Sequence, residues 1–176
     1  TRRSSDLKQT ELPHLKTASK IADAVKGNDV FCDPKIIARQ RILEGKKINV
    51  IYNYAPYPNG KEKLHFLLVP KAHRTDFNDL TEEEYIEASE LTQTLINYYK
   101  TKGYDVAHIF HKTGAKAGQT VFHWHQHLVF TTTKTQGFWT KLKVFHLAFS
   151  IPLSEKELES RVSALRQELA ELGADL

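Results

Sequence analysis

The sequence predicts a single globular domain that combines β-strands with helices. Four stretches are rich in β-branched and aromatic residues, as strands require: 47–54, 64–69, 106–111 and 122–131. Apolar residues recur at helical spacing after Thr81 and after Ser154, and a glutamate follows each of these two residues three positions later. The length of 176 residues suits one domain with a substantial core.

The composition limits the kind of protein. Hydrophobic residues make up 40% and charged residues 26%, the balance of a soluble globular protein, and no apolar run approaches the roughly 18 residues of a membrane span. The net charge of +4 favours polyanionic ligands, but the basic residues are scattered, unlike those of a nucleic-acid binder. Cys32 is the only cysteine, which excludes a disulfide framework and a multi-cysteine zinc site. We therefore expect a cytoplasmic protein with no membrane partner.

The first part of the chain predicts an arm followed by the start of the domain. Residues 1–28 are polar and then weakly helical in pattern, which indicates either an arm with one short helix or a disordered leader. Pro34 opens a short helix or turn that runs to Ile42. Two strands, 47–54 and 64–69, enclose the turn-forming sequence 55–60 and predict a hairpin.

Two helices are predicted from their start signals. Thr81 and Glu84 form a capping box that opens a long helix ending near Gly103. Ser154 and Glu157 form a second one. The helix after it carries a stripe of apolar residues at spacings of four and three, buried on the domain itself or against a partner chain: Leu158, Val162, Leu165, Leu169 and Leu172. The stretch 141–150 is a candidate for a further strand. These elements divide the chain into an arm (1–28), a central domain (29–152) and a C-terminal amphipathic helix (153–176).

A row of histidines is the most informative feature. At the strand period of two, His123, His125 and His127 share one face of the stretch 122–130, and mostly apolar side chains occupy the other. A loop of small residues at 114–120 precedes them, of the kind whose backbone N–H groups can turn toward an anion. Three half-buried imidazoles on one strand are rarely structural, because each needs hydrogen-bond partners.

Two chemical interpretations of the histidine row stay open at this point. His123 and His125 can converge on a metal ion, with His65 as a third ligand. Alternatively, the middle histidine attacks phosphorus and forms a covalent intermediate, while its neighbours orient it and manage protons. The small-residue loop favours the second interpretation, since its N–H groups can stabilise charge on phosphoryl oxygens.

Two blocks of the sequence resemble the histidine triad (HIT) family. Residues 118–129, GQTVFHWHQHLV, match the pattern His-x-His-x-His with Gly-Gln-Ser/Thr before it, and residues 64–73, LHFLLVPKAH, with 78–81, NDLT, match the other conserved block of the family. The resemblance extends over about residues 30–132. It implies an α+β, HIT-like fold: an antiparallel sheet of about five strands with one long helix packed on it, here with an added C-terminal helix, often paired into a homodimer.

The resemblance also implies roles for individual residues. His125 corresponds to the nucleophile, His127 to its partner near the phosphate and leaving group, and His123 and His65 to supporting histidines. By the same resemblance, Asn53 is expected to contact the ribose. Gln119 and Thr120 are expected to contact the phosphoryl oxygens and the leaving group, with the backbone of Gly118 beside them. Lys112 departs from the usual Asn or Gln and either strengthens phosphate binding or points into solvent. No metal and no other cofactor is expected.

The implied function is that of a nucleotide hydrolase or transferase. The substrate is expected to be a purine nucleotide or dinucleotide, a nucleoside phosphoramidate or a dinucleoside polyphosphate, cleaved at the α-phosphate through a nucleotidyl-histidine. Two alternatives are a nucleotide-binding regulatory protein with little turnover and an aprataxin-like enzyme that removes AMP from nucleic-acid ends. The scattered basic residues and the single cysteine make a nucleic-acid partner the weaker expectation.

Overall fold

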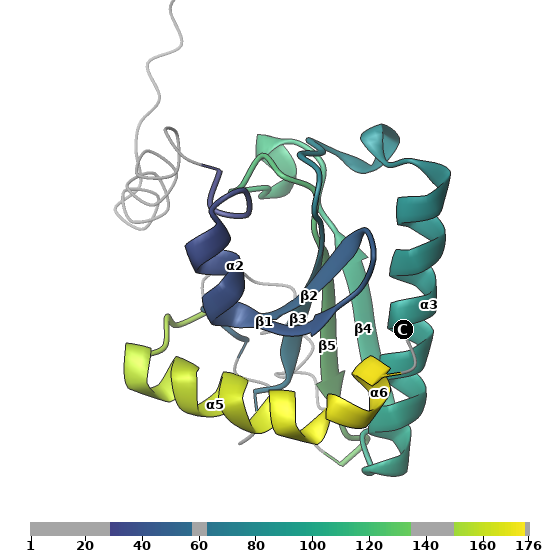
Figure 1. Cartoon of the computed structure of the whole chain (residues 1–176), viewed down its shortest axis with the longest axis vertical. Coiled ribbons are helices and arrows are strands. Elements are labelled where there is room, and N and C mark those ends of the chain that lie inside the picture. The colour runs from purple at the N-terminus through teal and green to yellow at the C-terminus, as the bar shows by residue number, and fades with distance from the viewer. Residues whose placement is uncertain (1–28, 58–62, 135–149, 175–176) are drawn as a thin grey trace, which may run out of the picture.

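The computed structural model describes residues 29–57, 63–134 and 150–174. The predicted arm at 1–28, part of the predicted turn at 55–60 and nearly all of the possible strand at 141–150 lie outside these ranges. Figure 1 shows the arrangement of the described elements, in which helices pack on a single sheet. Within the described ranges, no helix has the length and apolar character needed to cross a bilayer.

The sheet has five strands in the order β1-β2-β3-β5-β4, and every neighbouring pair is antiparallel. The strands are β1 (Arg41–Glu44), β2 (Ile48–Tyr52), β3 (His65–Pro70), β4 (Val106–His111) and β5 (Gln126–Thr131). The helices are α2 (Pro34–Gln40), α3 (Glu82–Thr101), α5 (Glu155–Glu168) and α6 (Ala170–Ala174), with short 3-10 turns at Phe77–Asp79 and Ala115–Ala117. The prediction of an α+β fold with an antiparallel sheet is confirmed, as are the β2–β3 hairpin and the long helix.

Two boundaries differ from the expectation. The segment after Pro34 is helical only to Gln40, and the next four residues form β1, which pairs with β2. The histidine strand begins at Gln126 rather than at Phe122. His123 and His125 therefore lie in the segment that leads into β5, and only His127 is part of the strand.

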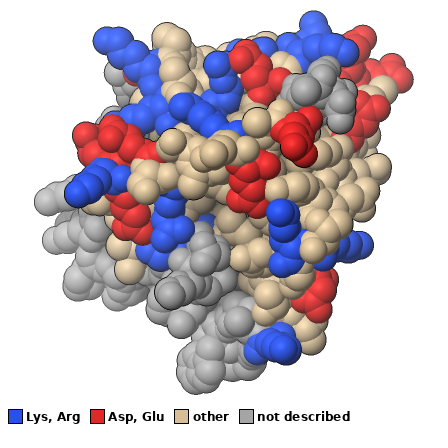
Figure 2. Space-filling view, turned by 60° about the horizontal axis from the view of Figure 1, so that its bottom comes forward, with Lys and Arg blue, Asp and Glu red and all other residues tan. Residues whose placement is uncertain are grey.

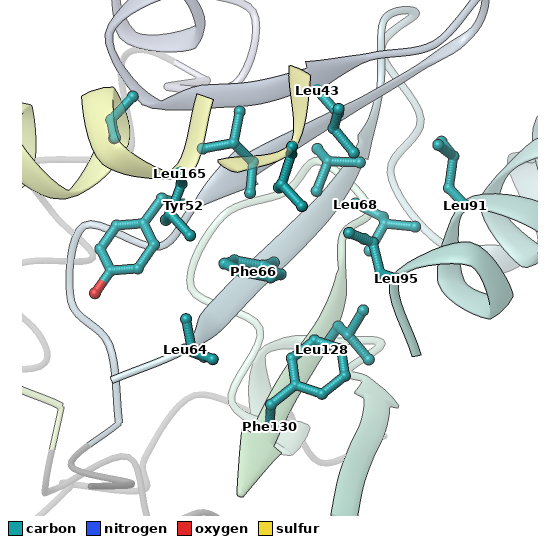
Figure 3. Close-up of a cluster of buried hydrophobic side chains, with 14 of the residues drawn as sticks. Leu43, Tyr52, Leu64, Phe66, Leu68, Leu91, Leu95, Leu128, Phe130 and Leu165 are labelled. Atoms are coloured by element: carbon teal, nitrogen blue, oxygen red, sulfur yellow. The ribbon is translucent and has the colours of Figure 1, made fainter. Parts of the chain in front are cut away.

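One face of the sheet carries the main core. Side chains that alternate along the strands point to this face, where leucines of α3 and α5 cover them (Figure 3). Fully or almost fully buried members include Tyr52, Phe66, Leu68, Leu91, Leu95, Leu128, Phe130 and Leu165. The predicted stripe of α5 belongs to the same cluster: Leu158 and Leu169 are completely buried. Burial of the stripe therefore needs no partner chain.

The two long helices begin at side-chain caps. The Thr81 hydroxyl accepts from the Glu84 N–H, and the Glu84 carboxylate accepts from the Thr81 N–H at 2.8 Å, the predicted capping box. Ser154 caps α5 in the same way through the Glu157 N–H. The Glu157 carboxylate instead contacts Arg161 and Lys63. Of the second predicted capping box, the hydrogen bond to the Ser154 hydroxyl is therefore the half that is observed.

The remaining face of the sheet points away from α3. It presents the odd-numbered residues of β3 and β5, which include His65 and His127. α2 covers part of this face, where Ile37 packs against Ile51 and Leu67. The sequence thus places apolar side chains on one surface of the same strands and imidazoles on the other.

Candidate active site

His65 and His127 form a hydrogen-bonded pair on neighbouring strands. The register of β3 and β5 places Leu67 opposite His127, so His65 is its diagonal neighbour. His65 Nε2 lies 2.9 Å from His127 Nδ1. His65 is completely buried and His127 is 7% exposed. A sheet face with two imidazoles in contact is consistent with the predicted supporting role of His65.

Backbone and side-chain partners indicate which nitrogen of each ring carries the proton. The Tyr57 N–H donates to His65 Nδ1 at 3.2 Å, so that nitrogen holds a lone pair. His65 then carries its proton on Nε2 and donates it to His127 Nδ1. His127 is left with its own proton on Nε2. The Tyr57 ring stacks on His65 at 4.6 Å and holds the plane of the imidazole, and the Asn53 amide nitrogen lies 3.2 Å from both of its ring nitrogens.

His125 has the opposite tautomer. Its Nδ1 lies 2.8 Å from the backbone carbonyl oxygen of His123. A carbonyl only accepts, so His125 Nδ1 carries the proton and Nε2 carries the lone pair. The rings of His125 and His127 are 5.0 Å apart. Two neighbouring imidazoles thus present one Nε2 that can attack an electrophile and one Nε2–H that can donate a hydrogen bond.

Burial keeps these histidines neutral. It lowers the pKa of His65 to about 3 and that of His125 to about 4, and it lowers the pKa of His127 well below its ordinary value. The nearby positive charge of Lys112 lowers all three further. At neutral pH the lone pair of His125 is therefore available without the loss of a proton.

Lys112 lies beside the histidines. It follows β4, is partly buried, and has a pKa that burial lowers from its ordinary value. Its Nζ is 6.0 Å from the ring of Phe110, and that ring stacks on His127 at 4.6 Å. The charge of Lys112 acts on the site histidines, and a contact between Lys112 and a phosphate stays a prediction.

The small-residue loop adopts the backbone that its glycines permit. Gly114 and Gly118 have φ angles of +86° and +87°, which residues with a Cβ adopt rarely. The Gly118 N–H donates to the Ala115 carbonyl at 3.0 Å. This N–H, expected to face a phosphate, is therefore used within the loop.

The side chain of Gln119 also holds the loop in place. Its Oε1 accepts from the Gly114 N–H at 2.7 Å, and its Nε2 donates to the Thr75 carbonyl at 2.8 Å. Gln119 is buried, whereas Thr120 is exposed. Contact of these two residues and of Gly118 with phosphoryl oxygens stays a prediction, as does contact of Asn53 with a ribose. The Asn53 oxygen accepts from the Ala55 N–H at 3.0 Å.

His123 belongs to a different environment from His125 and His127. It is completely buried, and its Nδ1 lies 2.7 Å from Asp29 Oδ2 and 3.7 Å from Cys32 Sγ. The predicted metal alternative grouped His123 with His125 and His65, and the structure does not bring those three together as ligands. In the described part of the chain, the residues whose donor atoms converge are Asp29, Cys32, His73 and His123.

Several site residues were not predicted from the sequence. The ring of Phe31 lies 5.2 Å from that of His125 and 5.9 Å from that of His123. Asp29 and Cys32 flank this phenylalanine. A signal was present only for His73, which lies in the block 64–73 that resembles the HIT family.

Comparison with known proteins agrees with this architecture. The family model described as the HIT domain matches residues 35–134. The open five-stranded antiparallel sheet with helices is the α+β architecture that solved HIT proteins share, and the chain belongs to the HIT family.

Relatives and solved structures extend the comparison. An uncharacterized HIT-like protein of Methanocaldococcus jannaschii is 31% identical over 71 residues, which is 40% of this chain and 55% of that protein. The match thus spans little more than half the length of that relative. A Hit-like protein involved in cell-cycle regulation from Bartonella henselae has a TM-score of 0.59 at 21% identity, over 80% of this chain and 95% of that one. The Plasmodium falciparum diadenosine triphosphate hydrolase has a TM-score of 0.55 at 18% identity, over 89% and 98%. At these identities the structures show a shared fold.

Proposed function

We propose that this protein is a nucleotide hydrolase or transferase that cleaves at the α-phosphate of a nucleoside phosphoramidate or dinucleoside polyphosphate. The opposite tautomers of His125 and His127 are the observation that carries the proposal. Membership of the HIT family supports it, and so does the similarity in fold to a diadenosine triphosphate hydrolase. The mechanism follows from the lone pair on His125 Nε2 and the proton on His127 Nε2.

In the first step His125 acts as the nucleophile. Its Nε2 lone pair attacks the α-phosphorus, a P–N bond forms, and the bond from phosphorus to the leaving group breaks with its electron pair on the leaving atom. The imidazole becomes positively charged, and its Nδ1–H continues to donate to the His123 carbonyl. The His127 Nε2–H and the charge of Lys112 stabilise the negative charge on the phosphoryl oxygens and on the leaving oxygen of a dinucleoside polyphosphate. A phosphoramidate leaves as an amine, so its nitrogen takes the proton from His127 Nε2, and the proton released in the second step restores it.

In the second step water attacks the phosphorus of the nucleotidyl-histidine. The P–Nε2 bond breaks, its electron pair returns to His125, and the products are a nucleoside monophosphate and one proton. An alcohol or another acceptor in place of water would give transfer rather than hydrolysis. His125 is thus the nucleophile of the first step and the leaving group of the second, and His127 and Lys112 stabilise charge in both.

A substrate panel tests the proposal. Diadenosine polyphosphates and AMP phosphoramidates are offered to the wild type and to His125→Ala, with release of AMP as the readout. Turnover by the wild type and its loss in the variant are expected. Full turnover by His125→Ala contradicts the proposal, and tight binding of nucleotide without turnover by the wild type indicates the regulatory alternative instead.

Action on nucleic-acid ends receives little support from the face of the molecule that Figure 2 shows. On the face shown in Figure 2, basic and acidic side chains are interspersed rather than gathered into a positive stripe. A nucleic-acid backbone favours a concentrated positive surface, because affinity comes largely from contacts with phosphates. Weak and salt-insensitive retention of adenylated, nicked DNA is therefore the expected result of a filter-binding assay.

We further propose that the protein is a homodimer. β4 is an outer strand of the described sheet, and Ile109 on it is 50% exposed. An outer strand with an apolar side chain is suited to pairing with a second copy. Sedimentation is expected to give a dimer for the wild type and a monomer for Ile109→Asp, whereas a wild-type monomer contradicts the proposal.

A further inference from the structure

The candidate nucleophile lies just outside the sheet. β5 begins at Gln126, and its pairing with β3 and its pairing with β4 both end at this residue. His125 therefore precedes the ladder of backbone hydrogen bonds that fixes the rest of the strand. A nucleophile has to be held within about 0.5 Å of its reacting geometry. Other contacts must then hold the backbone on either side of His125, and α3 supplies two of them.

The first contact runs from Trp124 to α3 through Arg74. The Trp124 N–H donates to the Arg74 carbonyl at 2.5 Å. The guanidinium of the same arginine donates through Nε to the Glu84 carboxylate, with distances of 2.9 Å to Oε2 and 3.2 Å to Oε1. Glu84 lies in the first turn of α3 and is 3% exposed. A buried carboxylate thus fixes the residue whose carbonyl holds the neighbour of His125.

Glu84 is itself held from two sides. Its Oε2 also accepts from the Thr81 N–H at 2.8 Å, as the capping box requires. Burial by itself would raise the pKa of Glu84, but the hydrogen bonds from Arg74 and from the Thr81 N–H lower it below its usual value. The carboxylate is therefore ionised at neutral pH, and it forms a partly buried charge pair with Arg74.

The second contact joins α3 to the residue after His125. The Gln126 side chain donates through Nε2 to the Thr92 hydroxyl at 2.8 Å, and that hydroxyl donates to the Ala88 carbonyl at 2.7 Å. Thr92 is buried, and Gln126 is half-buried. Polar side chains of one helix thus hold the residues immediately before and after His125.

The turn after β3 holds the small-residue loop as well. Arg74 is followed by Thr75, whose carbonyl accepts from Gln119 Nε2 at 2.8 Å and whose N–H donates to Asp79 Oδ2 at 2.9 Å. The N-terminal end of α3 and the start of β5 lie at the same end of the sheet (Figure 1). The pair of Arg74 and Glu84 therefore orders a turn that supports both the histidine segment and the loop.

We propose that Glu84 and Thr92 are positioning residues for His125, the first acting through Arg74 and the second through Gln126. The inference rests on the proposed function, because it concerns the same covalent step. Loss of either link frees the backbone at 124–126, so that His125 Nε2 is less often aligned with the α-phosphorus. A displacement of about 1 Å at a reacting atom costs about 10²-fold in rate. Binding of nucleotide does not need this alignment and is expected to stay unchanged.

Conservative substitutions separate the two links. Glu84→Gln keeps an oxygen for the Thr81 N–H, because glutamine also serves in a capping box, but it removes the charge that holds Arg74. Thr92→Val keeps the volume of the side chain and removes the hydroxyl. Glu82→Gln is the matched control, since Glu82 is exposed and lies in the same first turn of α3.

The rate of adduct formation and the affinity for nucleotide are measured separately. In single turnovers of a diadenosine polyphosphate stopped with alkali, Glu84→Gln and Thr92→Val are each expected to form the nucleotidyl-histidine about tenfold or more slowly than the wild type. The Kd for AMP is expected to stay the same. Thr92→Ser, which restores the hydroxyl, should recover the rate, and Glu82→Gln should not lower it. Rates of Glu84→Gln and Thr92→Val equal to that of Glu82→Gln overturn the proposal.

A double variant tests whether Glu84 acts through Arg74. Arg74→Gln keeps the backbone carbonyl and removes the charge, so it should slow adduct formation to a similar extent. Addition of Glu84→Gln to Arg74→Gln should slow it no further, because both substitutions break one contact. Two effects that multiply would show that Glu84 acts by another route, which overturns its assigned link to His125.

Hydrogen exchange measures the first link without turnover. The Trp124 N–H is expected to exchange about tenfold or more faster in Glu84→Gln than in the wild type, whereas the Leu128 N–H, within the sheet, should keep its rate. Unchanged exchange at Trp124, or equal acceleration at both amides, overturns the proposal even in a protein that cleaves nucleotides. A wild type without turnover contradicts the proposed function instead, and the exchange rates then decide whether α3 holds the segment around His125.

Discussion

His65 and His127 contact each other through their ring nitrogens, with Nε2 of the first 2.9 Å from Nδ1 of the second. The contact joins β3 to β5 and makes the proton on His127 Nε2 depend on a residue 62 positions earlier in the chain. His65 does not itself have to touch the substrate. Its part in the proposed reaction is to hold His127 as a hydrogen-bond donor.

Replacement of His127, the proposed hydrogen-bond donor, is expected to slow the cleavage reaction. His127→Ala removes an Nε2–H aimed at developing negative charge, so kcat should fall by about 10²–10³-fold. His65→Leu keeps His127 but leaves its Nδ1 without the donor observed here, and a smaller loss is expected. Steady-state kinetics on a dinucleoside polyphosphate measure both changes. An unchanged kcat in His127→Ala contradicts the assigned role.

The buried His65 predicts how stability depends on pH. Burial lowers its pKa in the folded state to about 3, against about 6.5 in the unfolded chain. Between these values the unfolded state binds more protons, so the free energy of unfolding rises with pH. The contribution of His65 is complete above about pH 6.5 and is lost as the pH falls toward 3.

Urea unfolding at several pH values measures this dependence. The wild type is expected to lose stability on acidification more steeply than His65→Leu, which cannot take up that proton. The exposed His111→Gln serves as the control and should keep the wild-type slope. Equal slopes for the wild type and His65→Leu would rule out the buried, neutral state of His65.

Lys112 is expected to bind phosphate. Lys112→Met removes a partly buried positive charge beside the site histidines. KM for a dinucleoside polyphosphate should rise about tenfold or more, because that factor corresponds to the free energy of one hydrogen bond to a charged group. The exposed Lys100→Met on α3 is the matched control and should leave KM unchanged. Equal KM values for the two variants would show that Lys112 does not contact the substrate.

The C-terminal helix is expected to stabilise the domain. Leu158 is completely buried in the core that the sheet and α3 share, and Leu158→Ala should lower the free energy of unfolding by about 2–5 kcal/mol. Ile151 is 71% exposed, so Ile151→Ala should have little effect. Chemical denaturation measures the free energy of unfolding of both variants. If Leu158→Ala lowered it no more than Ile151→Ala does, the packing of α5 would be contradicted.

Features encoded in local sequence were predictable. β4 has the predicted bounds, and α3 starts where Thr81 and Glu84 indicate, because alternation and capping are properties of a few adjacent residues. β1 was not predicted, since four residues are too few to show a period and its strand character comes from pairing with β2. The strand conformation of β1 therefore depends on tertiary contacts rather than on its own four residues.

Some residues of the candidate site were also predictable from the sequence, whereas their surroundings were not. The spacing of the three histidines indicated a shared surface. His65 was named first as a third metal ligand and then, through the resemblance of its segment to a family motif, as a supporting histidine. The distinct environment of His123 could not be inferred, because Asp29 and His73 reach it from positions 94 and 50 residues away in the chain. The glycine loop was located correctly, but the direction of its N–H groups depends on turns that only the folded backbone defines.

The central claim is that His125 forms a covalent bond to phosphorus. Rapid alkaline quench of the wild type during turnover of a diadenosine polyphosphate tests it most directly, followed by intact-mass measurement and peptide mapping without exposure to acid, which cleaves a phosphorus–imidazole bond. The expected result is a transient nucleoside monophosphoryl adduct on His125 that forms and decays fast enough to account for turnover and is absent from His125→Ala. Turnover without any adduct, or an adduct on another residue that persists in His125→Ala, would contradict the proposed mechanism.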